Sequence, residues 1–396
     1  MRVGLVCAHG STPERPDIPV GPRHHVAQVA ARLAARGHEV RVYDRRDDPQ
    51  SSALVEVNGY LVERAPIGPP SRAACGALVP HVPEFAHWLA ERWSSGWTPD
   101  VLHGTFWLGG LVAASAVRSS RIPVVQTFYS LGAEQARRLG TGYDGPDQRI
   151  PLERALTRVI DAAIAQSTDE VEELTRMGLE RAAVTVVPVG VDIERFRPEG
   201  ETADWGGQQR ILSPAGLGPG RGHEDLIQAM RLITDAELVI IGGPRPEELA
   251  DHSQARRLVE LAERVGVRDR VRLIGSVPYE EMAAWYRSAD VVACAYHYAC
   301  VGRVPLEAMA CGVPVVGYAL GAVGDVVVDE VTGRLVPPGD VRGLAVTLRR
   351  LLADEAQRFA YGHAAVDRVR CSYTWDRAAA ALERVYERVA PAPAVA

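Results

Sequence analysis

The sequence predicts an α/β protein with two doubly wound domains, each built around a parallel sheet. Three observations lead to this fold class. Short apolar runs alternate with segments of helical periodicity along the chain, which is typical of parallel sheets covered by helices on both faces. The 396 residues, of which 47% are hydrophobic, suffice for two domains. Residues 192–209 are polar, contain Gly and Pro and lack periodicity, which indicates a connector.

In the first half of the chain, we expect each short apolar run to be a buried strand. These runs are Val3–Cys7, Val40–Tyr43, Asp100–His103, Pro123–Phe128, Ala163–Gln166 and Val184–Pro188. Between the first two runs, apolar side chains recur at helical spacing, and Gly37 follows them as a stop signal. The members of this helical face are Val26, Val29, Ala30, Leu33 and Ala34.

The alternation restarts after the connector, with a glycine-rich loop that leads into a helix from Glu224. The expected strands are Arg210–Ser213, Ala236–Ile241, Val271–Ile274, Val291–Ala295 and Val313–Val316. A final helix is expected over Trp375–Val389, with Thr374 as its N-cap. Ligands of doubly wound sheets bind at the carboxyl ends of the strands, and a cleft between two such domains is the expected active site.

Composition and charge exclude several classes of function. All 44 basic residues are arginine, because the sequence contains no lysine, so Schiff-base and P-loop lysine chemistry are excluded. The net charge of −6, with both signs interspersed, predicts no nucleic-acid partner. The first apolar run is too short for a signal peptide or a membrane span. The six cysteines lack metal-binding spacing, so we expect reduced thiols and a cytoplasmic location.

The segment Ala295–Val316 carries the most informative motif. A strand leads to a turn at Gly302, and Pro305 is expected at the first position of a helix. Backbone N–H groups at such a turn, together with the helix dipole, fit an anion. Glu307, expected in the first turn, can chelate a vicinal diol such as a ribose. The alternative is a plain strand-to-helix turn whose glutamate complements the dipole.

Other polar residues are expected at the surface, namely His38 and the acidic clusters 44–48 and 170–173.

Four segments make the chain resemble the GT-B glycosyltransferases of family 4, which are retaining enzymes that transfer sugar from a nucleotide-sugar. They are His24–Val40, Val187–Asp192, Pro305–Val316 and Thr332–Asp340, of which the third is the most specific. The resemblance covers nearly the whole chain. It is closest to the branch that holds sucrose-phosphate-synthase-like enzymes and the inositol-phosphate glycosyltransferase of mycothiol synthesis.

The resemblance implies two Rossmann-like domains with an intervening cleft. The acceptor-binding domain is expected over residues 1–195 and the nucleotide-sugar-binding domain over residues 209–372. A helix within residues 373–390 is expected to cross back to the first domain. The resemblance also implies that no metal is needed, and we expect no cofactor other than the UDP- or GDP-linked donor.

On the donor side, the chain departs from the family pattern at two places. Glu307 matches the second of two glutamates spaced eight apart, which is implied to hold the nucleotide ribose, whereas Ala299 replaces the first, which is implied to lie beside the transferred sugar. The family's Arg and Lys on the donor diphosphate match Gly216 and Arg221. Arg221 keeps the positive charge, but its planar guanidinium group replaces the compact ammonium group of the family's lysine. The remaining residues expected to bind the donor are Val277, His297, Tyr298, Gly302, Arg303 and Val304.

On the acceptor side, we expect contributions from Gly21, His24, His103 and Tyr129. The family's two-glycine loop becomes Gly21-Pro22, which removes one backbone N–H. A family histidine becomes Tyr129, and of a His-x-His-x-Trp pattern only the first histidine, His103, remains together with the tryptophan.

We expect Arg221, His103 and Arg303 to be catalytic. Arg303, on the phosphate-binding turn, is the candidate to supply the cation that Gly216 lacks; the alternative is a solvent-facing arginine. A site that lacks the family's arginine at Gly216 and its glutamate at Ala299 favours a sulfur nucleophile, since a thiolate or thione attacks without a strong base. This suggests antibiotic or thiol biosynthesis with S-glycosylation, as in the lincosamide-pathway enzymes that use ergothioneine. The alternatives are a non-catalytic nucleotide-sugar binder and a pseudo-glycosyltransferase. The partners are a nucleotide-sugar and a small acceptor; a homodimer is compatible with the sequence.

Overall fold

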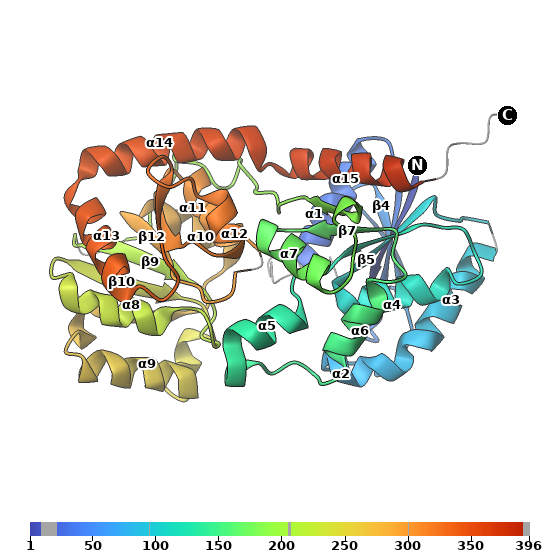
Figure 1. The fold of residues 1–396 in the computed structure, drawn as a ribbon, viewed down its shortest axis with the longest axis horizontal. Coiled ribbons are helices and arrows are strands. Elements are labelled where there is room, and N and C mark those ends of the chain that lie inside the picture. The colour runs from blue at the N-terminus through green and yellow to red at the C-terminus, as the bar shows by residue number, and fades with distance from the viewer. Residues whose placement is uncertain (9–21, 95, 205–206, 300, 391–396) are drawn as a thin grey trace. The chain divides into compact units, whose positions relative to one another are not determined.

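The computed structural model describes residues 1–8, 22–94, 96–204, 207–299 and 301–390. The chain divides into two compact units, and Figure 1 colours them along the sequence. Unit 1 takes residues 1–136, 143–188 and 375–396, and unit 2 takes residues 137–142 and 189–374. Each unit is built around its own largely parallel sheet with helices on its faces, which confirms the predicted fold class.

Within the described residues, the sheet of unit 1 contains eight strands in the order β3-β4-β2-β1-β5-β6-β7-β8. Every neighbouring pair is parallel except β3 and β4, which are antiparallel. The apolar runs that predicted strands fall on six of the eight. The strands are β1 (Arg2–Cys7), β2 (Glu39–Arg45), β3 (Leu54–Val57), β4 (Tyr60–Ala65), β5 (Val101–Thr105), β6 (Val124–Thr127), β7 (Ala162–Ala165) and β8 (Val184–Val186).

The hairpin of β3 and β4 is missing from the sequence prediction. Its turn is Asn58-Gly59, and both residues adopt positive φ angles of 46° and 83°. Asn-Gly between two short strands is the signature of a two-residue hairpin turn, because these two residues tolerate the left-handed conformation. The signal was therefore available in the sequence.

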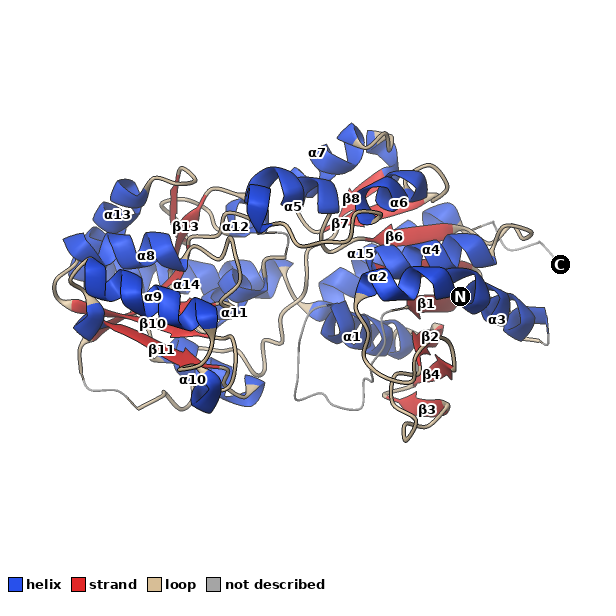
Figure 2. Cartoon of the chain, turned by 90° about the horizontal axis from the view of Figure 1, so that it is seen from below, coloured by secondary structure: helices blue, strands red, loops and turns tan. Residues whose placement is uncertain are grey.

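Helices α1 and α15 lie on one face of the unit 1 sheet, and α3 and α4 lie on the other (Figure 2). The apolar face predicted for α1 packs against the sheet, and Gly37 follows the helix with φ 88°, as its stop signal predicts. The helices that lie wholly in the ranges of unit 1 are α1 (Pro22–Ala35), α2 (Cys75–Leu78), α3 (Val82–Ser94), α4 (Phe106–Ala116), α6 (Arg149–Leu156), α7 (Thr168–Arg176) and α15 (Trp375–Val389). Helix α5 (Gly132–Leu139) begins in the range of unit 1 and ends in that of unit 2.

The described sheet of unit 2 has six parallel strands in the order β11-β10-β9-β12-β13-β14. Counted along the chain, this is the order 3-2-1-4-5-6 of a dinucleotide-binding fold. The direction of winding reverses between β9 and β12, and this reversal locates the expected ligand crevice. The strands are β9 (Gln209–Pro214), β10 (Ala236–Ile241), β11 (Val271–Gly275), β12 (Val291–Cys294), β13 (Val315–Tyr318) and β14 (Gly333–Val336).

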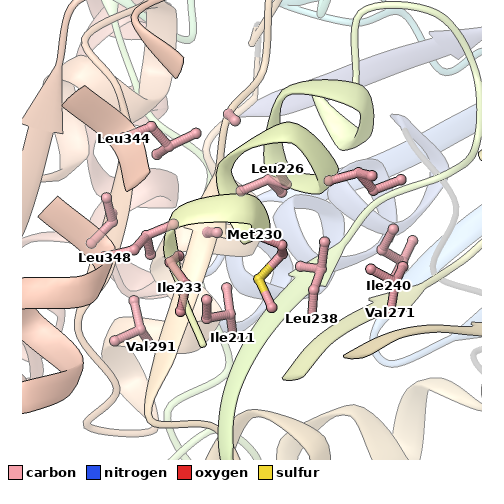
Figure 3. Close-up of a cluster of buried hydrophobic side chains, with 14 of the residues drawn as sticks. Ile211, Leu226, Met230, Ile233, Leu238, Ile240, Val271, Val291, Leu344 and Leu348 are labelled. Atoms are coloured by element: carbon pink, nitrogen blue, oxygen red, sulfur yellow. The ribbon is translucent and has the colours of Figure 1, made fainter. Parts of the chain in front are cut away.

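Helices α8, α9 and α13 pack on one face of the unit 2 sheet and bury its apolar core. Figure 3 shows this cluster, in which Leu226 and Met230 lie against Ile211 and Leu238, with Leu344 and Leu348 beside them. The helices of unit 2 are α8 (His223–Ala229), α9 (Ser253–Arg264), α10 (Met282–Arg287), α11 (Arg303–Ala310), α12 (Gly321–Val326), α13 (Val341–Ala353) and α14 (Glu355–Ser372).

Several polar residues expected at the surface are buried, so that part of the sequence interpretation is wrong. His38 lies beside Glu383 of α15, with Nε2 2.9 Å from Oε1. Asp44, Glu170 and Glu173 are each at most 3% exposed. Glu170 lies at the amino end of α7 and accepts a hydrogen bond from the Gln166 backbone N–H at 2.6 Å. Within the acidic run 170–173, Glu170 and Glu173 are thus buried in the fold, whereas Glu172 is exposed.

Glu170 predicts a pH-dependent stability. Burial raises its pKa from 4.5 to about 8, so the folded chain holds a proton that the unfolded chain releases. The free energy of unfolding should therefore fall from pH 5 to pH 8 by up to about 1.4 kcal/mol per pH unit on account of this group. We expect Glu170→Gln to remove this component, as measured by urea unfolding. Tryptophan fluorescence is a suitable signal, because Trp88, Trp93, Trp97, Trp107 and Trp375 all belong to unit 1.

Glu172→Gln on the same helix is the matched control, since Glu172 is exposed and pairs only at the surface with Arg176. It should leave the pH dependence of unfolding as in the unsubstituted chain. Equal slopes for all three proteins between pH 5 and pH 8 would contradict the buried, protonated state of Glu170.

Candidate functional site

The candidate site lies in unit 2, where the loops after β9 and β12 meet at the reversal of winding. Two hydrogen bonds join the loops. The His297 backbone N–H donates to the Gly220 carbonyl at 2.9 Å, and the Tyr296 hydroxyl donates to the Pro214 carbonyl at 3.1 Å. Because both loops follow the carboxyl ends of adjacent strands, their side chains and N–H groups share one edge of the sheet.

Gly222 allows the two loops to approach closely. Its φ is 74°, and a Cβ there would lie 1.8 Å from the Ala295 carbonyl oxygen. Both the left-handed backbone and the close contact require glycine at this position. Any larger residue would separate the two loops.

The loop after β9 presents a charge beside open space. Arg221 is exposed, and a Cβ at Gly216 or Gly218 would meet no atom within 4 Å. His223, the first residue of α8, contacts the loop, with its Nε2 3.2 Å from the Gly216 carbonyl oxygen. Burial lowers the pKa of His223, which keeps this ring neutral near pH 7. Arg221 therefore supplies the positive charge in this part of the site.

Glu307 lies in α11 as a buried carboxylate with three partners. It accepts hydrogen bonds from the Tyr279 hydroxyl at 2.9 Å and the Tyr286 hydroxyl at 2.8 Å, one on each oxygen. The Arg303 Nε lies 3.7 Å from Oε1. Burial raises the pKa of Glu307, while Arg303 and the two hydroxyls oppose that rise. A carboxylate oxygen accepts more than one hydrogen bond, so each keeps capacity for a ligand hydroxyl.

The position of α11 corrects two expectations. The helix begins at Arg303 with Gly302 as its N-cap, so Pro305 is its third residue and not its first. Glu307 is the fifth residue, and the first turn contains no acidic residue. Proline is tolerated there because the third N–H of a helix has no intrahelical partner. Glu307 is consequently held by side-chain contacts rather than by the helix dipole.

His297 follows β12 and contacts Asp225 of α8, with 3.0 Å between Nε2 and Oδ2. The same oxygen accepts a hydrogen bond from the Tyr318 hydroxyl at 2.6 Å. The hydrogen bond to Asp225 raises the pKa of His297, and its side chain is 40% exposed.

The other predicted donor residues lie near this edge of the sheet. Ala299 is buried, and its carbonyl accepts a hydrogen bond from the Ala322 N–H at 2.9 Å. Tyr298 is buried, Gly302 caps α11, and Val304 is half-buried in its first turn. Val277 is half-buried after β11, two residues before Tyr279.

Sequence reasoning missed Tyr279, Tyr286, Asp225 and Tyr318. The two partners of Glu307 are seven residues apart, on a turn and helix that precede β12. Asp225 is the third residue of α8, which directly follows the glycine-rich loop. Asp225 could have been found from its position, because it lies just after the glycine-rich loop that the sequence analysis had assigned to the donor. Nothing in the sequence connects Tyr318 to Asp225.

In unit 1, the predicted acceptor residues lie on or after the first strands. His103 is 3% exposed and both ring nitrogens are engaged, with Nδ1 2.6 Å from the Tyr386 hydroxyl and Nε2 2.8 Å from Thr127 Oγ1. Burial lowers the pKa of His103 to about 3, so the ring is neutral. In this arrangement the histidine joins β5, β6 and α15, and both ring nitrogens are used within unit 1.

An aromatic group surrounds the start of α1. His25 is buried and contacts the rings of Tyr129 and Trp375, with centroid distances of 5.1 and 5.3 Å. His24 is half-buried, and its ring contacts Trp375 at 5.8 Å. The structure thus brings His24 and Tyr129 to one group, whereas Gly21 lies outside the described residues.

Two aromatic residues at this edge have strained backbones. Phe106 follows β5 with φ 59°, and Tyr129 lies two residues after the end of β6 with φ 60°. A bulky residue in the left-handed region costs of order 1–3 kcal/mol, and such strain is concentrated at functional sites. The strained residues therefore mark the carboxyl edge of the unit 1 sheet as a candidate functional edge.

Two features are absent from the described residues. None of their helices is long and apolar enough to cross a membrane. No group of three or more His, Cys, Asp or Glu side chains in the described ranges is arranged to hold a metal ion.

Comparison with known families now defines the class of protein. Residues 20–190 match the glycosyl transferase 4-like domain, and residues 201–368 match the glycosyl transferases group 1 domain. The chain therefore belongs to the group 1, family 4-like glycosyltransferases of the GT-B fold, and it is an enzyme of that class.

Individual relatives narrow the comparison. The chain is 34% identical to the D-inositol 3-phosphate glycosyltransferase of Xylanimonas cellulosilytica, over 97% of this chain and 96% of that protein. It is 31% identical to the enzyme of the same name from Streptomyces avermitilis, over 97% and 87%. The structure resembles sucrose-phosphate synthase from Thermosynechococcus elongatus, with a TM-score of 0.86, 26% identity and 98% coverage of each chain.

A more distant structure was solved with nucleotide. The HepE protein of Anabaena, in complex with UDP and glucose, has a TM-score of 0.74 at 17% identity and covers 98% of this chain and 100% of its own. At this identity the likeness concerns the fold alone.

Proposed function

We propose that the protein transfers a sugar, with retention of anomeric configuration, from a nucleoside diphosphate sugar to a small acceptor. One observation carries the donor part. A cationic loop and a buried carboxylate, Arg221 and Glu307, lie beyond neighbouring strands at the reversal of winding in unit 2, where dinucleotide-binding sheets take their ligands. The name of the D-inositol 3-phosphate glycosyltransferases, at up to 34% identity, supports the same reaction class.

In this proposal each donor group has a residue to hold it. Glu307 accepts hydrogen bonds from the ribose hydroxyls. Arg221 and the first N–H groups of α11, at Arg303 and Val304, bind the diphosphate and stabilise the charge that develops as it departs. His297, Tyr298 and Ala299 border the sugar, with Gly216, Val277 and Gly302 completing the donor side. The UDP named for one structural neighbour makes UDP-sugars the first donors to test.

The acceptor is assigned to unit 1, where His24 and Tyr129 lie together. The relatives' name makes D-inositol 3-phosphate the first acceptor to test. The absence of a carboxylate at Ala299 favours ergothioneine as the second, because a sulfur nucleophile needs less assistance from a base.

The test is a panel of UDP-, GDP- and TDP-sugars incubated with inositol phosphate, thiol, thione and amine acceptors. Products are identified by mass spectrometry, and the anomeric configuration by NMR. A product with retained configuration supports the proposal. Tight nucleotide binding without any product would favour a non-catalytic binder, and an inverted anomer would contradict retention.

Arg303 carries a separate prediction, because it can supply the cation missing at Gly216. Its side chain is 35% exposed, and its Nε lies 3.7 Å from Glu307 Oε1. The guanidinium group has further N–H donors, so it can contact the carboxylate and a bound ligand at the same time. We expect Arg303→Ala to weaken UDP-sugar binding by about tenfold, the loss of one charge-assisted hydrogen bond. Isothermal calorimetry with UDP-glucose checks this value.

Arg195→Ala is the matched control, since Arg195 and Arg303 both lie over the Tyr279 ring, at 5.0 and 6.0 Å from its centroid. Loss of a ring contact alone should weaken binding equally in the two variants. Unchanged affinity and turnover in Arg303→Ala would show that this arginine does not compensate for Gly216.

A further inference from the structure

The cluster of Asp225, His297 and Tyr318 comes from three separate elements. Asp225 belongs to the first turn of α8, Tyr318 ends β13, and His297 lies in the loop after β12. The Tyr318 hydroxyl and His297 Nε2 meet on the same carboxylate oxygen, at 2.6 and 3.0 Å. The two rings also contact each other edge to face, with centroids 5.7 Å apart. The imidazole is thus held from two sides.

This ring lies beside the loop that is expected to hold phosphate. The His297 backbone N–H donates to the Gly220 carbonyl, one residue before Arg221. Since Nε2 is used by Asp225, Nδ1 is the ring nitrogen left for a ligand. On the same loop, Gly216 offers neither a side chain nor a charge, and the space above it is open. The His297 ring therefore belongs to a residue that contacts, at Gly220, the same loop on which Gly216 lacks a charge.

We propose that protonated His297 is a catalytic residue whose Nδ1–H donates a hydrogen bond to the donor diphosphate, and that Asp225 and Tyr318 are positioning residues for its ring. This inference rests on the proposed function and assigns one charge of its donor site. It gives the chain a cation that depends on pH, in addition to the permanent charge of Arg221.

The transfer step then balances as follows. The bond between the anomeric carbon and the diphosphate oxygen breaks, and its electron pair stays on that oxygen. The acceptor heteroatom bonds to the anomeric carbon, and its proton passes to the departing diphosphate. His297 keeps its own proton and stabilises the new negative charge through the hydrogen bond.

The surrounding charges favour the protonated ring. Asp225 and Glu224 of α8 both raise the pKa of His297 above its usual 6.5, and the hydrogen bond to Asp225 is the largest contribution. Tyr318 remains a neutral hydroxyl, because burial and Asp225 raise its pKa. His223 is neutral near pH 7, and Arg221 is the permanent cation of the loop. Within this group, His297 is thus the residue whose charge changes with pH, at a pKa raised above the usual 6.5.

The experiment measures the affinity of the full chain for UDP-glucose from pH 5.5 to 8.5, with GDP-mannose as the second donor. Both diphosphates are esterified at each end and keep two charges in this range, so the ligand does not titrate. We expect the affinity to fall about ten- to hundredfold as His297 loses its proton. His297→Gln should bind weakly at every pH with a flat profile.

Two variants and one ligand separate this role from a structural one. Asp225→Asn should move the midpoint of the profile to lower pH, because it removes the carboxylate that stabilises the cation. Tyr318→Phe should keep a titration with a shifted midpoint. Uridine, which lacks phosphate, should bind all four proteins equally and without this pH dependence.

The outcomes distinguish the two proposals. If the unsubstituted chain binds neither these two nucleotide-sugars nor any other UDP-, GDP- or TDP-sugar of the panel, the proposed function is wrong, and this inference falls with it. If it binds them but His297→Gln and Asp225→Asn keep its affinity and its profile, the role of His297 is overturned and the proposed function stands. Equal losses for uridine and UDP-glucose would assign His297 to the loop structure instead.

Discussion

Arg221→Met should lower the rate of sugar transfer about 10²- to 10³-fold, the usual cost of removing one preorganised group from a developing charge. Arg221 is the exposed arginine of the loop after β9, beside the open space at Gly216. Steady-state kinetics with the donor and acceptor identified by the panel measure the effect. Arg221→Lys should retain most of the rate, because it keeps the charge and restores the residue that the family pattern has there.

The loop also offers a rescue experiment. A Cβ at Gly216 would meet no atom within 4 Å, so we expect the fold to accept Gly216→Arg. Added to Arg221→Met, it should recover at least tenfold in rate if both positions face the same diphosphate. Full activity of Arg221→Met would remove Arg221 from the donor site, and failure of the rescue in a slow Arg221→Met background would show that positions 216 and 221 do not face the same diphosphate. Tryptophan fluorescence and circular dichroism verify that each variant is folded.

Glu307→Gln should weaken binding of UDP-glucose by about 10- to 100-fold, because hydrogen bonds from ribose hydroxyls to a carboxylate are stronger than those to a neutral amide. The substitution keeps a carbonyl acceptor for one of the two hydroxyls, Tyr279 or Tyr286, and its amide N–H can donate to the oxygen of the other. Calorimetry with UDP-glucose and with its 2′-deoxyribose analogue isolates the ribose contact. The unsubstituted chain should discriminate between the two ligands, and Glu307→Gln should not.

Tyr279→Phe is the matched control for Glu307, since it removes one hydrogen bond from the carboxylate and leaves the charge in place. It should keep the preference for ribose over 2′-deoxyribose. If Glu307→Gln retains the full preference, the glutamate does not contact the ribose, and its contacts with the tyrosines and Arg303 are its whole role.

Continuous apolar runs allowed eleven of the fourteen described strands to be predicted to within two residues at each end, whereas β3, β4 and β14 were not predicted. A strand such as Ala236–Ile241 is buried on both faces, so its sequence must be apolar throughout. The predicted strand at Val184–Pro188 is shorter in the structure, because β8 is an edge strand and ends at Val186. Edge and hairpin strands such as β3 carry exposed residues, and this removes the apolar signal.

The candidate site was predictable only where its residues lie on loops that follow strands. Arg221, His297 and Glu307 belong to segments that chain order places near a strand end. The partners that fix them could not be found in this way, because Tyr286 and Tyr318 meet Glu307 and Asp225 only after the strands have stacked into the order 3-2-1-4-5-6. The charges of buried groups were also unpredictable, since Glu170 and Glu172 differ in burial and not in sequence type.

The contacts of α15 have a consequence for the order in which the chain can fold. Tyr386 meets His103, Trp375 meets His25, and Glu383 meets Arg36 and His38, so unit 1 is completed by residues from the far end of the sequence. During synthesis the segment 189–374 emerges in one piece before these partners exist. Unit 1 therefore cannot complete its packing until residues 375–389 have been made, and until then His25, His103 and the surface of α1 that α15 contacts lack these partners. A nascent chain that ends before residue 375 should accordingly bind chaperones through its first half.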